Sequence, residues 1–255
     1  MLKKMKCCLF ELILGVFLLV GFSTVPAYAD WKDSIINKIT SLAIDRVTGI
    51  LKNDQGSTVE QKKKFDIAVS FYHERNYEEA IKKFNEALDL TEKESIRSVI
   101  YSMLASCYKE LNDFDKASEN YGFAINRLCF DLYNNGDNER QWIKSNLFLE
   151  YFLRGEFYSD SGKYREAVSD FIHALDQVED EPEKVEAGTF IRWSRYLLSK
   201  LHYELGCAYV KLNEHPKARE AFEKALVLED DWLSVSVNRQ LVEVALQAES
   251  TAKEL

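Results

Sequence analysis

The four histidines of this 255-residue chain are the side chains most suited to acid–base or metal chemistry. His73, His173, His202 and His215 have no metal-ligand spacing with one another or with a cysteine. The patterns H-E-x-x-H and G-x-S-x-G and a phosphate-binding glycine loop do not occur. Asp and Glu are plentiful in helical patterns, where they are typical of solvated faces. The sequence therefore predicts no catalytic residue, no metal and no cofactor, and an enzyme assembled from distant residues is the least favoured alternative.

The cysteines do not predict a disulfide framework. Cys7 and Cys8 lie near the start of the chain, and Cys107, Cys129 and Cys207 are spread over 100 residues farther along. Cys107 and Cys207 fall beside expected core positions, where a cysteine acts as a small buried hydrophobe. A bridge between two of the last three cysteines stays an open alternative.

The first 29 residues have the layout of a secretory signal peptide. Three lysines in "MLKKMK" precede the apolar stretch "CLFELILGVFLLVGF", and small residues follow at Ala27 and Ala29. We expect cleavage after Ala29 and a periplasmic or extracellular protein that meets the membrane only during export. The alternative is an uncleaved membrane anchor, but the apolar stretch is shorter than the ~20 residues that span a bilayer and contains Glu11.

The charge balance argues against nucleic acid and anionic membranes as partners. Of 33 basic and 42 acidic residues, the predicted signal peptide holds three lysines and one glutamate. The remaining chain has 30 basic and 41 acidic residues, a formal charge of −11. An acidic chain is repelled by phosphate-rich surfaces, so we expect no nucleic acid partner.

One residue pattern occurs four times and predicts the elements that must position any functional side chain. An alanine is followed by an aromatic residue four positions later and by a second alanine after three more. The copies are Ala80, Phe84, Ala87; Ala117, Tyr121, Ala124; Ala167, Phe171, Ala174; and Ala218, Phe222, Ala225. Residues with these spacings share one face of a helix. We call these twelve residues the seam.

A second helix is predicted before each seam. Twelve positions before each first seam alanine lies a small residue, and nine positions before it lies an aromatic one. The small residues are Ala68, Ala105, Gly155 and Gly206, and the aromatic residues are Phe71, Tyr108, Tyr158 and Tyr209. The small residue allows the two helices to approach closely, and the aromatic side chain fills the remaining gap. Asn76 with Glu79 is a candidate capping box, and Pro216 suits a first helical turn.

These offsets resemble those of the tetratricopeptide repeat (TPR) family, whose unit is a helix–turn–helix of 34 residues. The resemblance covers about residues 61–232 and implies an all-α solenoid of about four units, near 61–94, 98–131, 140–181 and 190–232. The family's frequent terminal proline is absent, and Arg154 stands where other copies have Ile67, Leu104 and Leu205. The alignment of Trp142 with Trp193 predicts first helices about two turns longer in the last two units.

Two further segments flank the predicted repeats, one on each side. Residues 30–56 are expected to form an amphipathic helix and a linker, with the apolar stripe Ile36, Ile39, Ala43, Val47 and Ile50. Residues 233–250 are expected to cap the array, so that the solenoid domain spans 57–250. The helix of residues 30–53 has three possible roles that the sequence leaves open: filling the groove, dimerising or touching the membrane.

The resemblance implies that the first helix of each unit lines a concave groove. The groove candidates are Phe65, Val69, Tyr72, Ser102, Ser106, Lys109, Phe152, Glu156, Tyr203 and Val210, with Ser159 and Cys207 at equivalent positions. Because this set is mostly apolar or neutral, we do not expect it to bind the carboxylate tail of a chaperone. It is suited to an apolar or amphipathic segment, unless these residues only pack between helices.

The predicted function is that of an exported, non-enzymatic scaffold that binds a peptide or protein segment in the groove. The alternative is a structural subunit that forms homo-oligomers through residues 30–53.

Overall fold

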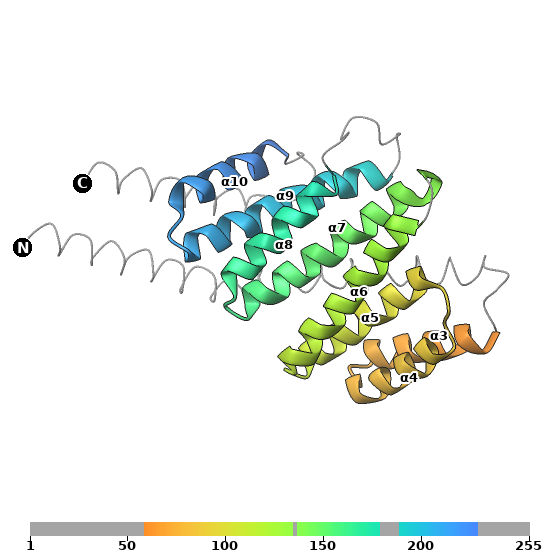
Figure 1. Cartoon of the computed structure of the whole chain (residues 1–255). Helices are drawn as coiled ribbons and strands as arrows, with labels where there is room; N and C mark the ends of the chain where they lie inside the picture. The colour runs from red at the N-terminus through yellow and green to blue at the C-terminus, as the bar shows by residue number, and fades with distance from the viewer. Residues whose placement is uncertain (1–58, 135–136, 179–188, 229–255) are drawn as a thin grey trace, which may run out of the picture. The chain divides into compact units, whose positions relative to one another are not determined.

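The computed structural model describes residues 59–134, 137–178 and 189–228. These ranges contain eight α-helices and no β-strand, which confirms the predicted all-α fold (Figure 1). All of them belong to one of the two units into which the chain divides, Ile44–Leu228; the other, Met1–Ala43 with Glu229–Leu255, contains none of them. The predicted signal peptide (1–29), amphipathic helix and linker (30–56) and capping helix (233–250) lie outside the described residues.

The helices form four consecutive pairs. The pairs are α3 (Val59–His73) with α4 (Tyr77–Asp89), α5 (Glu94–Glu110) with α6 (Phe114–Asn134), α7 (Asp137–Asp160) with α8 (Tyr164–Asp176), and α9 (Thr189–Lys211) with α10 (His215–Val227). Each helix packs against the next one along the chain, more extensively within a pair than between pairs. The pairs therefore stack in sequence order.

Helix lengths confirm one prediction and add an unexpected feature. The first helices α7 and α9 have 24 and 23 residues, whereas α3 and α5 have 15 and 17. The second helix α6 is also long, with 21 residues against 13 in α4, α8 and α10. Its extension is accounted for by α7, because Ile125 and Leu128 form one apolar cluster with Ile143 and Leu147.

The turn inside each pair has the same backbone geometry in all four copies. One residue in each has a positive φ: Arg75 (60°), Asn112 (59°), Gly162 (75°) and Asn213 (58°). The next residue donates its N–H to the carbonyl of the repeat aromatic: Asn76 to Phe71 (2.9 Å), Asp113 to Tyr108 (2.9 Å), Lys163 to Tyr158 (2.8 Å) and Glu214 to Tyr209 (2.9 Å). This is a Schellman helix end, so the repeat aromatic anchors the turn through its backbone.

The turn residues then start the second helix. Asn76 accepts a hydrogen bond from the N–H of Glu79 through its side chain, at 3.4 Å. This is one half of the predicted capping box, and the Glu79 carboxylate lies 3.7 Å from Lys82. Pro216 lies in the first turn of α10, as expected. A single short turn thus ends one helix and starts the next.

The seam is the core of each pair. Every seam residue is buried, and so are the four small residues of the first helices. The four repeat aromatics of the first helices are only half-buried. The pattern read from the sequence therefore marks the contact between the two helices of each pair.

Two of the small residues have no room for a side chain. A Cβ atom on Gly155 would lie 2.6 Å from Cε1 of Phe171, and one on Gly206 would lie 2.5 Å from Cε1 of Phe222. Both distances are shorter than a carbon–carbon contact of about 3.5 Å. The ring of the seam aromatic thus occupies the space over the glycine, and this fixes how closely the two helices approach.

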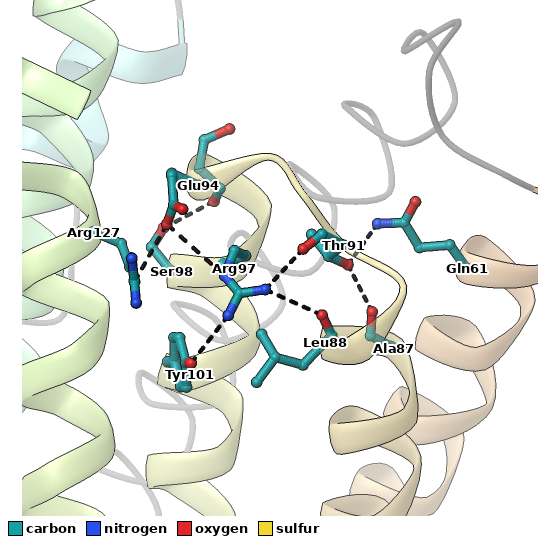
Figure 2. A network of polar contacts seen from close by, with 10 residues as sticks. Gln61, Ala87, Leu88, Thr91, Glu94, Arg97, Ser98, Tyr101 and Arg127 are labelled. Atoms are coloured by element: carbon teal, nitrogen blue, oxygen red, sulfur yellow. Dashed lines mark hydrogen bonds and ion pairs between the residues drawn. The ribbon is translucent and has the colours of Figure 1, made fainter. Parts of the chain in front are cut away.

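The connection between α4 and α5 shows how a pair ends without the proline typical of the family (Figure 2). The Thr91 hydroxyl donates to the carbonyl of Ala87 at 2.6 Å and accepts from Gln61 of α3 at 2.6 Å. Arg97 donates to the carbonyls of Leu88 (3.3 Å) and Thr91 (2.8 Å). Side chains therefore satisfy the carbonyls at the end of α4.

The same network reaches the second pair. The carboxylate of Glu94 lies 3.9 Å from Arg97 and 3.3 Å from Arg127 of α6, and Arg97 also donates to the Tyr101 hydroxyl at 3.4 Å (Figure 2). These contacts tie the start of α5 to the end of α4 and to α6.

Replacing Gly155 with alanine tests the close approach of the helices. We expect Gly155→Ala to lower the free energy of unfolding by about 1–2 kcal/mol, because overpacking outweighs the better helix propensity of alanine. Gly122 is the matched control, since a Cβ atom there meets nothing within 4 Å. Gly122→Ala should raise stability by about 0.5–1 kcal/mol. Urea unfolding measures both, and equal effects of the two substitutions would contradict the explanation.

Candidate functional site

The predicted groove residues lie on the first helices, and three of their rings are buried. Phe65, Phe152 and Tyr203 expose 1%, 0% and 2% of their surface. Each packs against the seam ring of its own pair, with centroid distances of 5.8 Å to Phe84, 6.2 Å to Phe171 and 5.8 Å to Phe222. Their packing role is thus observed, in line with the alternative that these residues pack between helices, and a role in partner binding stays a prediction.

The remaining groove candidates differ in their exposure. Val69, Tyr72, Ser106, Lys109 and Val210 are half-buried. Ser102 and Glu156 are buried. The ammonium group of Lys109 reaches across to Asp160 of α7 at 3.2 Å. The half-buried members are therefore the part of this surface that a partner could contact without unfolding a pair.

A buried ion pair joins the third pair to the fourth. Lys200 of α9 donates to the Glu156 carboxylate of α7, and their side chains expose only 1% and 3% of their surface. The Lys200 ammonium also lies 5.1 Å from the centre of the Phe152 ring. The groove candidate Glu156 thus holds two first helices together, because a buried charge is tolerated only with its partner in place.

A second ion pair lies inside the third pair. Arg154 of α7 donates two hydrogen bonds to Asp170 of α8, from Nε and Nη2, each at 2.7 Å. The guanidinium lies 5.7 Å from the Tyr151 ring centre and 5.8 Å from that of Tyr158. Two parallel hydrogen bonds to a carboxylate are the preferred geometry of arginine. This pair explains why Arg154 departs from the apolar residues of the other copies.

Another buried acid of the first helices has no ion pair among the described residues. Glu150 of α7 is 7% exposed, and Ser102 of α5 hydrogen-bonds its carboxyl group. Its Oε2 atom has no hydrogen-bond partner in the part of the chain that the structure describes. Burial raises the pKa of Glu150 from 4.5 to about 8, although Ser102 and the charge of Arg154 oppose the shift. Glu150 is therefore mostly protonated at neutral pH.

The first helices are thus more highly charged inside than the sequence pattern predicts. Arg154 and Asp170 could have been found together, because Asp170 stands where the other copies have Lys83, Asn120 and Ala221. Glu150 and Lys200 carry no such signal. The equivalent positions in the other copies hold lysine or apolar residues: Lys63, Ile100 and Leu201 for Glu150, and Lys62, Val99 and Leu149 for Lys200.

The residues first considered for chemistry lie apart. Burial lowers the pKa of His202 to about 4, so it is neutral at pH 7, and His173 stacks on Tyr151 with a centroid distance of 5.2 Å. Burial raises the pKa of the Cys107 thiol to about 12. None of Cys107, Cys129 and Cys207 is in a disulfide. Within the described ranges no three His, Cys, Asp or Glu side chains are grouped to hold a metal ion.

Removing one partner of the buried ion pair should be costly, and removing both should not. We expect Lys200→Met to lower the free energy of unfolding by about 3–5 kcal/mol, because Glu156 is left buried without a counter-charge. The double variant Lys200→Met/Glu156→Leu should recover most of this loss. Denaturant unfolding of Lys200→Met, Glu156→Leu and the double variant gives the double-mutant cycle that measures the interaction.

The exposed pair Lys217–Glu214 (2.6 Å) is the control for this cycle. Lys217→Met should leave the unfolding midpoint nearly unchanged, since solvent screens exposed charges. A double variant as unstable as Lys200→Met would contradict the assignment.

Glu150 should make stability depend on pH. Its pKa is about 8 in the folded protein and near 4.5 in the unfolded chain, so the folded state holds the proton between these values. Stability should therefore fall as pH rises from about 6.5 to 8, on the order of 1 kcal/mol per pH unit. Below pH 6.5 the lowered pKa of His202 has the opposite effect on stability. Glu150→Gln should flatten this slope, and Glu119→Gln on the exposed face of α6 should retain it. Urea unfolding at pH 7 and 8.5 measures both, and a slope that persists in Glu150→Gln would assign it elsewhere.

Family models recognise three segments of this chain. Residues 99–125, 151–177 and 199–232 each match a tetratricopeptide repeat model. They fall in the second, third and fourth helix pairs. No curated protein sequence matches the chain.

Solved structures with the same fold share little sequence. BtubC (BKLC) from P. vanneervenii has a TM-score of 0.54 at 18% identity, covering 83% of this chain and 82% of that one. A Podosopora anserina putative kinesin light chain with nearly identical TPR-like repeats has a TM-score of 0.52 at 15% identity, covering 76% and 89%. A double mutant of MamA RS-1 has a TM-score of 0.51 at 15% identity, covering 77% and 94%. At these identities the likeness shows the fold alone.

No helix in the described ranges has the length and apolar character needed to cross a bilayer.

The repeated helix pairs, the shared turn geometry and the matching models lead to one conclusion: the chain carries tetratricopeptide repeats arranged as an α-helical solenoid.

Proposed function

We propose that this protein is an exported, non-enzymatic scaffold that binds a peptide or protein segment along its first helices. Tetratricopeptide repeats generally serve as protein-interaction scaffolds, and the repeats of this chain support that broad class. The observation that carries the proposal is the constancy of the four helix pairs. The same turn and the same seam in every pair hold the half-buried side chains Val69, Tyr72, Lys109 and Val210 at fixed positions on successive first helices.

Rigid presentation favours binding for a physical reason. In a solenoid each repeat contacts its neighbours, so a row of side chains is held in place by the array and not by the partner. Little conformational entropy is then lost when a segment binds. Val69, Tyr72 and Val210 offer apolar surface, and Ser106 and Lys109 offer polar groups between them. This composition suits an amphipathic segment.

Site-specific cross-linking tests the proposed surface. A photoreactive benzoylphenylalanine is placed at Tyr72 or Val210 on the first helices, or at Lys82 or Arg219 on the exposed faces of the second helices. We expect one partner segment to be captured from both first-helix positions and from neither second-helix position. Equal capture from both sets would contradict binding along the first helices.

The same experiment distinguishes the alternative function. Cross-links that join only copies of this chain, and that disappear when residues 30–53 are deleted, would favour a structural subunit over a scaffold for another protein.

Export rests on the composition of residues 1–29. We propose that the chain is cleaved after Ala29 and works in a periplasmic or extracellular compartment. Mass spectrometry of the protein isolated from its source should find an N-terminal peptide that starts at Asp30. A mature protein that retains the peptide starting at Met1 would contradict cleavage.

A further inference from the structure

The carboxyl group of Glu150 is the starting point for a more specific statement about the partner. It lies between the first helices α5 and α7, where Ser102 contacts it from α5, and only 7% of the residue is exposed. The charged and titratable groups around it are Tyr121 of α6 and Arg154 of its own helix. Arg154 is committed to Asp170 through two hydrogen bonds.

Three cations of the first helices pair with acids other than Glu150. Lys109 pairs with Asp160, Arg154 with Asp170, and Lys200 with Glu156. Glu150 is left as an acid without an ion pair, and no described side chain bonds to its Oε2. Glu150 is thus a buried acid of α7 that no cation of these ion pairs neutralises.

Accessible groove residues lie close to this acid. The Tyr121 hydroxyl hydrogen-bonds Ser106, and it is within electrostatic reach of Tyr72 and of both Glu150 and Glu156. Tyr72 and Ser106 are half-buried. A side chain that enters beside Tyr72 and Ser106 therefore approaches Glu150.

We infer that the surface between α5 and α7 is a subsite for a basic side chain, and that the bound segment presents a lysine or arginine to Glu150. This inference rests on the proposed function and specifies the partner that the groove would take. A cation supplied by the partner compensates a carboxylate that is otherwise costly to bury. The aliphatic part of a lysine or arginine side chain packs against Tyr72, as the stems of these residues commonly do on apolar surfaces.

Binding should be coupled to proton release. Below pH 8 Glu150 holds a proton in the free protein, and a cation binds only the ionised form. The affinity should therefore rise as pH increases, by up to about tenfold per pH unit below pH 8, and level off above it.

Two peptides that differ only in the charge of one side chain test this inference. The probes are an acetylated, amidated 13-residue peptide of leucine and alanine with one central arginine, and the same peptide with citrulline, the neutral isostere of arginine. The full-length protein should bind the arginine peptide about tenfold more tightly at pH 8, as measured by calorimetry. Glu150→Gln should abolish this preference, and the matched variant Glu119→Gln on α6 should keep it.

Equal affinity of the wild-type protein for the two peptides would overturn the inference, and so would a preference that survives in Glu150→Gln. Unfolding measurements on Glu150→Gln show that the variant is folded before it is titrated. Cross-linking at Tyr72 reports whether a segment lies on the first helices whatever its charge. A lost arginine preference with intact cross-linking therefore removes the inference and leaves the proposed function, whereas failed cross-linking removes the proposed function itself.

Discussion

The close contact between the two helices of a pair depends on the absence of a side chain beneath one aromatic ring. In the last two pairs not even a Cβ atom fits beneath the ring, because Phe171 and Phe222 occupy the space that a Cβ atom on Gly155 or Gly206 would need. In the first two pairs an alanine fills the same position. Once this distance is fixed, the seam alanines can be buried and the turn can be short. Each pair then has the same internal geometry, against which the next pair packs.

Charge, not apolar contact alone, distinguishes the third and fourth pairs from the first two. Arg154 and Asp170 form an ion pair within the third pair, and Glu156 and Lys200 bridge the third and fourth pairs. Such pairs add little net stability over well-packed apolar residues, but each member is costly when left alone. They therefore favour one arrangement of neighbours over others. Glu150 is the exception, since its carboxyl group stays neutral at the cost of a raised pKa.

The fold followed from the sequence because small and aromatic residues repeat with a helical spacing that physical packing requires. The lengthened α7 and α9 followed from the alignment of Trp142 with Trp193. The extension of α6 could not be predicted in the same way, because it reflects contact of Ile125 and Leu128 with the next pair and has no counterpart elsewhere in the chain. The groove was harder to predict than the fold. Offsets place a residue on a helix face, but burial of Phe65, Phe152 and Tyr203 depends on side chains of other helices that the offsets do not include.

The ion pair between Glu156 and Lys200 has a consequence for how this array can change length. A solenoid of identical repeats can gain or lose a unit anywhere, because every junction is the same. Here the junction between the third and fourth pairs is unique: the second pair has Val99 and Ser106 at the positions of Lys200 and Glu156. A copy of the second pair inserted at this junction would separate the two charges and bury each without its partner. Recombination at this junction is thus penalised, and electrostatics favours the present order of the last two pairs.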